Sequence, residues 1–416
     1  MRTDPCLVST DLYAAAKFGT LSDVPVELLS EEALTTVDED KGYAPIHIAA
    51  MFGHLDQIPP ERLTAAVISA PSLDKLNALH YAAREHHLDQ VPKKLLTPEL
   101  LGDATHDYWT PAHEIAACGD IGLVPKGSFT KEVLTQSAST RTKFLHEPRE
   151  PAQPVRKALT RPEMSVIEIC LRNGSVEAIP RSALTTEVMH ANTCSKGATA
   201  MHVVAETGFW DSIPGRLETS QTAFLRDVMN ETPLHYAARS GKLGEAPPAL
   251  FTQASVTHRS DTGQTPLSDA AVYGYISQIP SEFLTRENLS ATYIEGKTVY
   301  HFAAASGTLA DLPPNALERS DLLRKDKLGA TPLHAAAMSK KLDKVPRGIV
   351  HAEDLGVVDK RGLSVEAVAC GFGCQDQAWD LVGEHRGSPV VSLQSLPADP
   401  QAGPASSLLK SIDRIF

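Results

Sequence analysis

The sequence repeats itself about every 33 residues, and this repetition restricts the chain to folds in which equivalent units stack on one another. The clearest copy is Thr-Pro-Leu-His-Tyr-Ala-Ala at 232–238. With His235 as an anchor, eleven equivalent positions occur, of which seven are histidine: Tyr13, His47, His80, His113, Glu168, His202, His235, Ser268, His301, His334 and Ala367. Nine of the ten spacings between them are 33 or 34 residues. A fixed period of this length is typical of a solenoid.

Each repeat begins with residues that favour a helix start and then places glycine where that helix should end. Threonine and proline precede the anchor, as in Thr232-Pro233, and this pair suits a helix cap and the first helical position. Alanine predominates two and three positions after the anchor, which allows close helix packing. Glycine recurs six positions after the anchor in nine repeats and predicts a helix end with a left-handed residue.

The segments at 232–238 and 331–337, the second being Thr-Pro-Leu-His-Ala-Ala-Ala, are similar to the signature of the ankyrin-repeat family. The resemblance covers roughly Thr10 to Val382. It implies an all-α, ankyrin-like repeat solenoid with about 11 full repeats plus one degenerate repeat. We therefore expect repeats over 1–137, a degenerate repeat over 138–160, further repeats over 161–384, and a flexible tail over 385–416 that ends in a short apolar helix.

The second half of each repeat departs from that family. An apolar residue followed by proline lies eleven and twelve positions after the anchor in ten repeats, as in Ile58-Pro59 and Ile279-Pro280. Because proline is not tolerated inside a helix, a new element must begin there. Serine or threonine then follows, often with an acidic residue two positions later, as in Thr285–Glu287. We expect a short helix or single turn after each proline, then a second short helix that begins at this Ser or Thr.

Two segments depart from the regular repeat period. The spacing of 55 residues between His113 and Glu168 accommodates the shortened repeat at 138–160, whose prolines predict a bend or an extruded loop. The last repeat lacks the apolar-proline pair, so Gln375–Val382 should form an ordinary helix that caps the array. Apolar residues near the end of the chain either fold back on the array or bind a partner: Leu408, Leu409, Ile412, Ile415 and Phe416.

The charge and the cysteine content disfavour several classes of protein. The net charge of −12 argues against a nucleic-acid partner, because such proteins need a basic face. No run of 18 apolar residues predicts a membrane span, and the segment 1–10 has no apolar stretch typical of a signal peptide. The six cysteines lack the spacing of secreted domains, so we expect a reduced, cytoplasmic protein. We also expect it to be a monomer.

No group of residues predicts a catalytic site, a cofactor or a metal. The seven anchor histidines occur one in each repeat, so we expect their rings to hydrogen-bond to the backbone in a ladder and not to converge on one site. Gly296-Lys297-Thr298 lacks the upstream glycine of a phosphate-binding loop. Cys370 and Cys374 lack further ligands that would complete a zinc site. We therefore expect that the protein is not an enzyme.

The remaining candidates lie on the surface. The ankyrin resemblance implies that partners meet the turn tips and the exposed end of the first helix. These slots follow the turn glycine or lie four and five positions after the anchor. They hold Tyr43, Met51, Phe52, Arg84, Trp109, Arg239 and Tyr273, and also Glu85, Glu206, Lys297 and Met338. Exposed aromatic and arginine side chains often dominate binding, and Tyr43, Phe52 and Trp109 favour the N-terminal third.

The sequence therefore predicts a protein-binding scaffold, adaptor or regulatory subunit. A secreted bacterial effector that binds a host protein is one form of this function. The alternative is a small-ligand binder or an enzyme with a site at the bend near 138–167. A pocket with converging polar groups in that segment would distinguish it from a scaffold. A self-assembling structural protein is a third hypothesis, which the proline-free last repeat disfavours.

Overall fold

The computed structural model describes residues 5–104, 109–138, 164–193, 196–217, 219 and 221–383. The chain divides into two compact units, 1–228 and 229–416. Within the described ranges the regular structure is helical, with isolated bridging pairs but no strand, so the expected all-α class is confirmed. The degenerate repeat at 138–160, apart from Ala138, and the tail at 385–416 lie outside the described residues.

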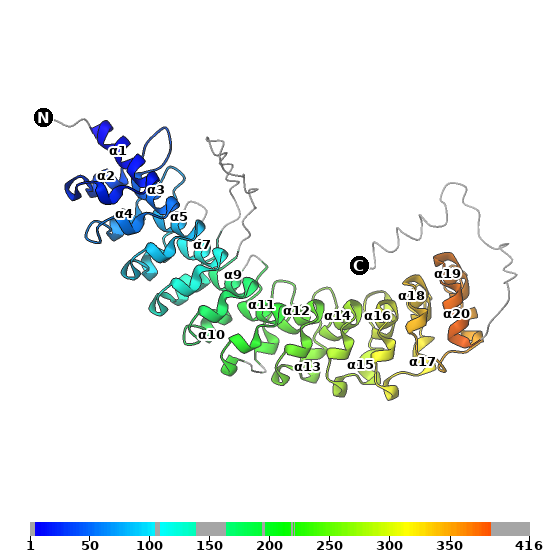
Figure 1. Ribbon diagram of the computed structural model, residues 1–416. Coiled ribbons are helices and arrows are strands. Elements are labelled where there is room, and N and C mark those ends of the chain that lie inside the picture. Colours follow the sequence, from blue (N-terminus) through cyan, green and yellow to red (C-terminus); the bar gives the residue numbers. More distant parts are fainter. Residues whose placement is uncertain are drawn as a thin grey trace. The chain divides into compact units, whose positions relative to one another are not determined.

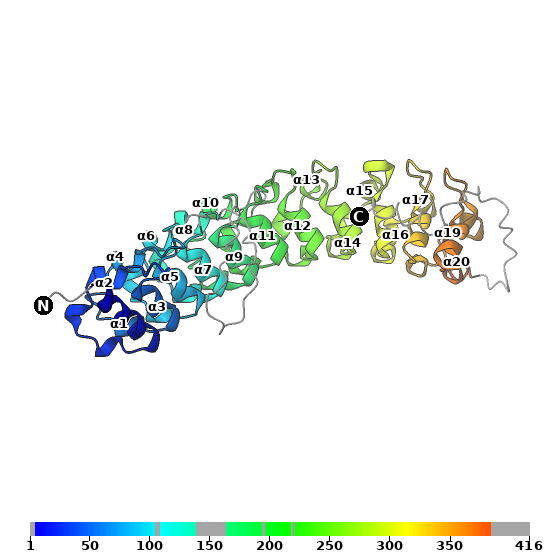
Figure 2. The same ribbon diagram turned by 90° about the horizontal axis from the view of Figure 1, so that it is seen from above.

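The helices of the first unit form two rows (Figures 1 and 2). The helices that carry the anchors pack side by side in chain order, and each begins a repeat. This row contains α1 (Pro5–Phe18), α3 (Pro45–Phe52), α5 (Ala78–Arg84), α7 (Pro111–Cys118), α9 (Val166–Asn173) and α11 (Ala200–Thr207). The other row contains α2 (Glu31–Thr35), α4 (Ala65–Ser69), α6 (Pro98–Leu101), α8 (Lys131–Thr135) and α10 (Thr186–Met189).

The second unit has the same two rows (Figure 2). The anchor helices again pack on their neighbours in chain order: α12 (Pro233–Ser240), α14 (Pro266–Tyr273), α16 (Val299–Ser306), α18 (Pro332–Met338) and α19 (Val365–Phe372). The shorter helices are α13 (Gln253–Val256), α15 (Arg286–Ser290) and α17 (Arg319–Leu322). Helix α20 (Gln375–Val382) packs against α19 and is the helix expected without a proline break.

Alanine lies at the contacts between the anchor helices. Ala49, Ala82, Ala237 and Ala336, each two positions after an anchor, have no exposed surface. A larger side chain at these positions would push two helices apart, and overpacking of this kind costs about 1–3 kcal/mol. The small side chains therefore set how closely successive repeats approach.

Glycine ends the anchor helices as predicted. In all nine repeats with glycine six positions after the anchor, that residue has φ between +71° and +84°. A Cβ atom at Gly241 would also lie 2.7 Å from the ring of Tyr275, which packs on it from the next repeat. Both the left-handed backbone and the close approach therefore require glycine there.

The apolar-proline pairs divide the second half of each repeat in the expected way. A single 3-10 turn follows most of these prolines, as at Val26–Leu28, Lys93–Leu95 and Ser281–Phe283. A serine or threonine side chain then accepts a hydrogen bond from a backbone N–H three residues later and begins a short helix. Seven residues act in this way: Ser30, Thr64, Thr97, Thr130, Thr185, Thr252 and Thr285. In α17 the bond has the opposite direction along the chain, because the carboxylate of Asp321, inside the helix, accepts from the N–H of Glu318, which precedes it.

Anchor histidines bond to the backbone on both sides of the ring, as seen for His47, His80, His113, His235, His301 and His334. In His301, Nδ1 accepts from the N–H of Thr298 at 3.1 Å, and Nε2 lies 3.2 Å from the carbonyl of Ala330 in the next repeat. Because Nδ1 accepts, the proton resides on Nε2, which donates to that carbonyl. The hydroxyl of Thr298 also donates to Nδ1, at 2.9 Å. The predicted ladder of structural histidines is confirmed.

The carbonyl that accepts the hydrogen bond from Nε2 lies at one of two positions in the sequence. His80, His235, His301 and His334 bond to the carbonyl 29 residues later, before the next anchor helix. His47 and His113 bond instead to the carbonyl 23 residues later, at the end of their own second helix. Either bond ties the anchor helix to a distant segment of the chain.

Burial keeps these rings neutral. It lowers the pKa of His47, His235 and His301 to about 4, although the backbone carbonyls at Nε2 act in the opposite direction. In the unfolded chain, a histidine binds its proton near pH 6.5. Between pH 6.5 and pH 4 the unfolded state therefore binds more protons than the folded state, and acidification favours unfolding.

We predict that replacing His301 by alanine lowers the free energy of unfolding by about 2–4 kcal/mol, since two hydrogen bonds and buried packing are lost. Replacement of the exposed His351 by alanine should cost less than about 0.5 kcal/mol. Urea denaturation at pH 7.5, followed by circular dichroism, measures both. In His301→Gln, the difference from the wild type should also shrink as the pH falls from 6.5 to 4. Equal costs for both alanine variants would contradict the ladder.

Candidate functional site

The exposed ends of the anchor helices are the surface where the sequence predicts partner binding. Phe52 and Tyr273, both five positions after an anchor, expose 42% and 52% of their surface. Met51 and Tyr43 are half-buried. The structure therefore places these four predicted residues at least partly on the surface.

Trp109 is not exposed, and the expectation that it contributes an open aromatic surface is wrong. Only 5% of its surface is accessible. Its ring N–H donates to Oε2 of Glu114 at 2.6 Å, and its ring packs beside that of His113 at 5.0 Å. Its carbonyl oxygen is also the acceptor for His80. Trp109 is therefore part of the contact between repeats.

Arg84 belongs to the same cluster. Its Nε donates to Oε1 of Glu114 at 3.0 Å, so the two carboxylate oxygens of Glu114 are divided between Arg84 and Trp109. The Arg84 guanidinium lies 5.8 Å from the ring centre of Tyr81, and Tyr43 packs edge-on against Tyr81 at 5.7 Å. Three of the predicted residues, Tyr43, Arg84 and Trp109, therefore meet in one network that crosses three repeats.

Arg239 is held in a similar cluster of the second unit. Its two terminal nitrogens bond to the two carboxylate oxygens of Glu231, at 2.6 and 2.5 Å. Asp269, in the next anchor helix, lies 3.7 Å from the same guanidinium and is 4% exposed. Burial raises the pKa of Asp269 to about 7 even though Arg239 acts to lower it. Arg239 thus pairs with carboxylates of its own chain. The sequence analysis had expected this arginine to be available to a partner.

Phe18 is an exposed aromatic side chain that the sequence analysis missed. It exposes 74% of its surface and lies five positions after the anchor Tyr13, as Phe52 does after His47. Helices α1 and α3 pack against each other, so the two phenylalanines occupy equivalent places on neighbouring helices. The shared register was the signal that could have identified Phe18.

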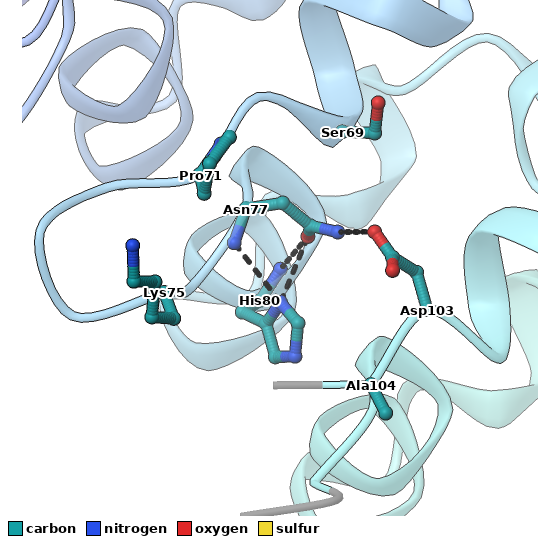
Figure 3. Close-up of a pocket in the computed structure, with 7 residues that line it drawn as sticks. All are labelled: Ser69, Pro71, Lys75, Asn77, His80, Asp103 and Ala104. Atoms are coloured by element: carbon teal, nitrogen blue, oxygen red, sulfur yellow. Dashed lines mark hydrogen bonds between the residues drawn. The ribbon is translucent and has the colours of Figure 1, made fainter. Parts of the chain in front are cut away.

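An open hollow of about 380 Å³ lies beside the start of α5 (Figure 3). Asn77 caps α5 and donates through Nδ2 to Asp103 at 3.3 Å, while Lys75 lies on the opposite side of the hollow. Lys75 has a left-handed backbone with φ of +63°. Because Asn77, His80 and Asp103 already bond to protein atoms, the hollow has few groups that could hold a ligand.

The alternative site near 138–167 falls mostly on residues 139–163, which lie outside the described ranges. Among the residues that are described, no three His, Cys, Asp or Glu side chains gather as metal ligands. Cys170, Cys370 and Cys374 are free thiols. None of the helices in the described ranges combines the length and apolar character needed to cross a membrane.

No model of a known protein family matches the chain, and a search of curated proteins finds no match.

We predict a strong energetic coupling between Arg84 and Glu114, because the Glu114 side chain is only 8% exposed and shares its oxygens with Trp109. Removing one partner leaves a buried charge unpaired. A double-mutant cycle with Arg84→Ala and Glu114→Ala should give a coupling of about 1–3 kcal/mol. The exposed pair Lys131 and Glu187, 2.9 Å apart, is the control and should give a much smaller coupling, because water and salt screen it. Equal coupling in the two pairs would mean that Arg84 remains available to a partner.

Proposed function

We propose that this chain is a non-catalytic scaffold, adaptor or regulatory subunit that binds another protein through a divergent ankyrin-like solenoid. The equal register of the anchor helices, and their packing in chain order within each unit, support such an architecture. The observation that carries the functional part is the exposure of Phe18 and Phe52 at equivalent positions of α1 and α3. We call these two residues, together with Met51, the first-helix surface.

The first-helix surface has the chemistry of an interface core. Helices in contact lie about 8–10 Å apart, so the two phenylalanines would contact neighbouring points of one partner. Aromatic residues and methionine are enriched at the centres of interfaces, and a large side chain left in water gains free energy when it is covered. The buried side chains that keep α1 and α3 in place are Leu12, Ala15 and Ala16 of α1 and His47, Ala49 and Ala50 of α3.

The location and the assembly state belong to the same proposal. We propose a reduced, cytoplasmic environment, which the free thiols of Cys170, Cys370 and Cys374 support. We propose that the protein acts as a monomer toward its partner and without a cofactor. A bacterial effector that binds a host protein would use the same surface.

The test is a pull-down from host-cell lysate with the intact protein and two variants. In the first variant, Phe18 and Phe52 are replaced by serine. In the control, Val26 and Leu28 are replaced by serine, because these apolar residues are 40% and 45% exposed but lie on a 3-10 turn of the same unit. We expect a stoichiometric protein with the wild type and the control, and a loss of at least about tenfold with the phenylalanine variant, since hot-spot residues contribute at least about 2 kcal/mol each.

Retention of the partner by both variants would contradict the first-helix surface as the binding site. The absence of a stoichiometric protein from all three samples would contradict the scaffold function. Circular dichroism melting curves should coincide for the three proteins, because each replaced side chain is exposed.

A further inference from the structure

The turns that precede the last anchor helices of the second unit carry an exposed row of apolar and basic residues. Ile294, Leu328 and Val358 expose 59%, 59% and 45% of their surface. Lys327, Lys360 and Arg361, from the same turns, are also exposed. We call these six residues the turn ridge.

Backbone bonds hold the turns of the ridge together. The N–H of Lys327 donates to the carbonyl of Glu295 at 2.7 Å, and the N–H of Lys360 donates to the carbonyl of Leu328 at 2.9 Å. A Cβ atom at Gly329 would lie 2.9 Å from the nitrogen of Lys360, so adjacent turns are in close contact. The three turns therefore form one continuous surface with a fixed spacing.

The acidic residues of these turns do not neutralise the ridge. Asp326 is 8% exposed, and its Oδ1 accepts from the N–H groups of Leu328 and Ala330. Asp359 is 5% exposed, accepts from the backbone of Leu363 and pairs with Arg361 at 2.8 Å. Glu295 pairs with Lys297 at 3.4 Å. Among the described residues, Lys327 and Lys360 form no ion pair, which leaves two cations beside the apolar side chains.

Two arginines of the second unit, at the starts of the short helices α15 and α17, are instead satisfied within the chain. Arg286 pairs with Asp321 at 3.0 Å, and Arg319 pairs with Asp354 at 2.7 Å. Paired cations of this kind hold adjacent repeats together. Lysines left unpaired beside exposed leucine and isoleucine favour an outside partner with negative charge and apolar side chains.

The charge of the whole chain decides between two kinds of acidic partner. An extended anionic surface, such as a membrane or a nucleic acid, would be repelled by the net charge of −12 of the whole chain. A short peptide segment senses mainly the charges within a Debye length, about 8–10 Å at physiological salt. The ridge therefore fits a local acidic segment better than an extended anionic surface.

We propose that the turn ridge binds a protein segment in which carboxylates alternate with large apolar side chains. The apolar side chains of that segment cover Ile294, Leu328 and Val358, and its carboxylates pair with Lys327 and Lys360. This inference rests on the proposed protein-binding function, but it assigns a second surface and the chemistry of its partner.

The test is a selection of peptides from a random 12-residue library on the intact protein. Selected peptides are then measured against two variants by fluorescence anisotropy. The ridge variant carries Lys327→Glu, Leu328→Ser and Lys360→Glu. The control carries Lys340→Glu and Lys341→Glu, which make the same change of charge at two exposed lysines beyond the end of α18.

We expect selected peptides to be rich in Asp, Glu, Leu and Phe, and to bind the ridge variant at least tenfold more weakly than the wild type and the control. Binding should also weaken as salt rises from 50 to 300 mM. Peptides without acidic residues, equal affinity for both variants, or no selected peptide would overturn the proposal. If the protein sediments with phosphatidylserine vesicles and the selected peptide does not release it, the partner of the ridge is a membrane and the proposal is overturned. If a lysate partner is lost from the phenylalanine variant while the peptide selection on the ridge fails, the scaffold function stands and only the ridge is rejected.

Discussion

Most of the repeats depend on a buried imidazole whose two nitrogens have different roles. Nδ1 must accept from the backbone N–H three residues earlier, and this requires the chain to turn into a helix at that point. Nε2 must reach a carbonyl 23 or 29 residues later, so the length of the second half is constrained as well. The backbone N–H can only donate, so it selects the tautomer with a bare Nδ1, and the hydroxyl of the capping threonine then donates to the same nitrogen. The fixed period of about 33 residues follows from these bonds and from the helix packing.

Two of the repeats without an anchor histidine hold the same contact by other means. In the repeat of Ser268, the hydroxyl of Tyr293 from the next repeat lies 2.8 Å from that of Thr265. In the repeat of Glu168, the N–H of Ser165 donates to the carbonyl of Thr193 at 3.0 Å. A tyrosine or a backbone amide can thus replace an imidazole. The buried polar groups of the two adjacent repeats need a hydrogen-bond partner, and any suitable donor or acceptor can supply it. These substitutions explain why the anchor position varies while the spacing does not.

The sequence was sufficient to predict features that arise within one repeat. Proline, glycine and threonine restrict the backbone locally, so the break after Pro280, the left-handed Gly241 and the cap at Thr285 were all predictable. The accessibility of side chains was not, because it depends on the neighbouring repeat. Trp109 and Arg84 occupy slots that are open in principle, but Glu114 of the adjacent helix binds both of them. Arg239 is held in the same way by Glu231 and Asp269. Ile294 and Leu328 precede the turn glycine, a position that the family resemblance did not mark.

The most direct measurement of the histidine ladder is the nitrogen NMR spectrum of the imidazole rings as the pH is lowered. Nitrogen shifts distinguish a protonated ring nitrogen from a bare one, and single His→Gln variants assign the anchor rings. Our account predicts that His47, His235 and His301 carry their proton on Nε2 at pH 7 and remain neutral at pH 5, because burial lowers their pKa to about 4. Rings that carry the proton on Nδ1, or that titrate near pH 6.5 in the folded protein, would contradict it.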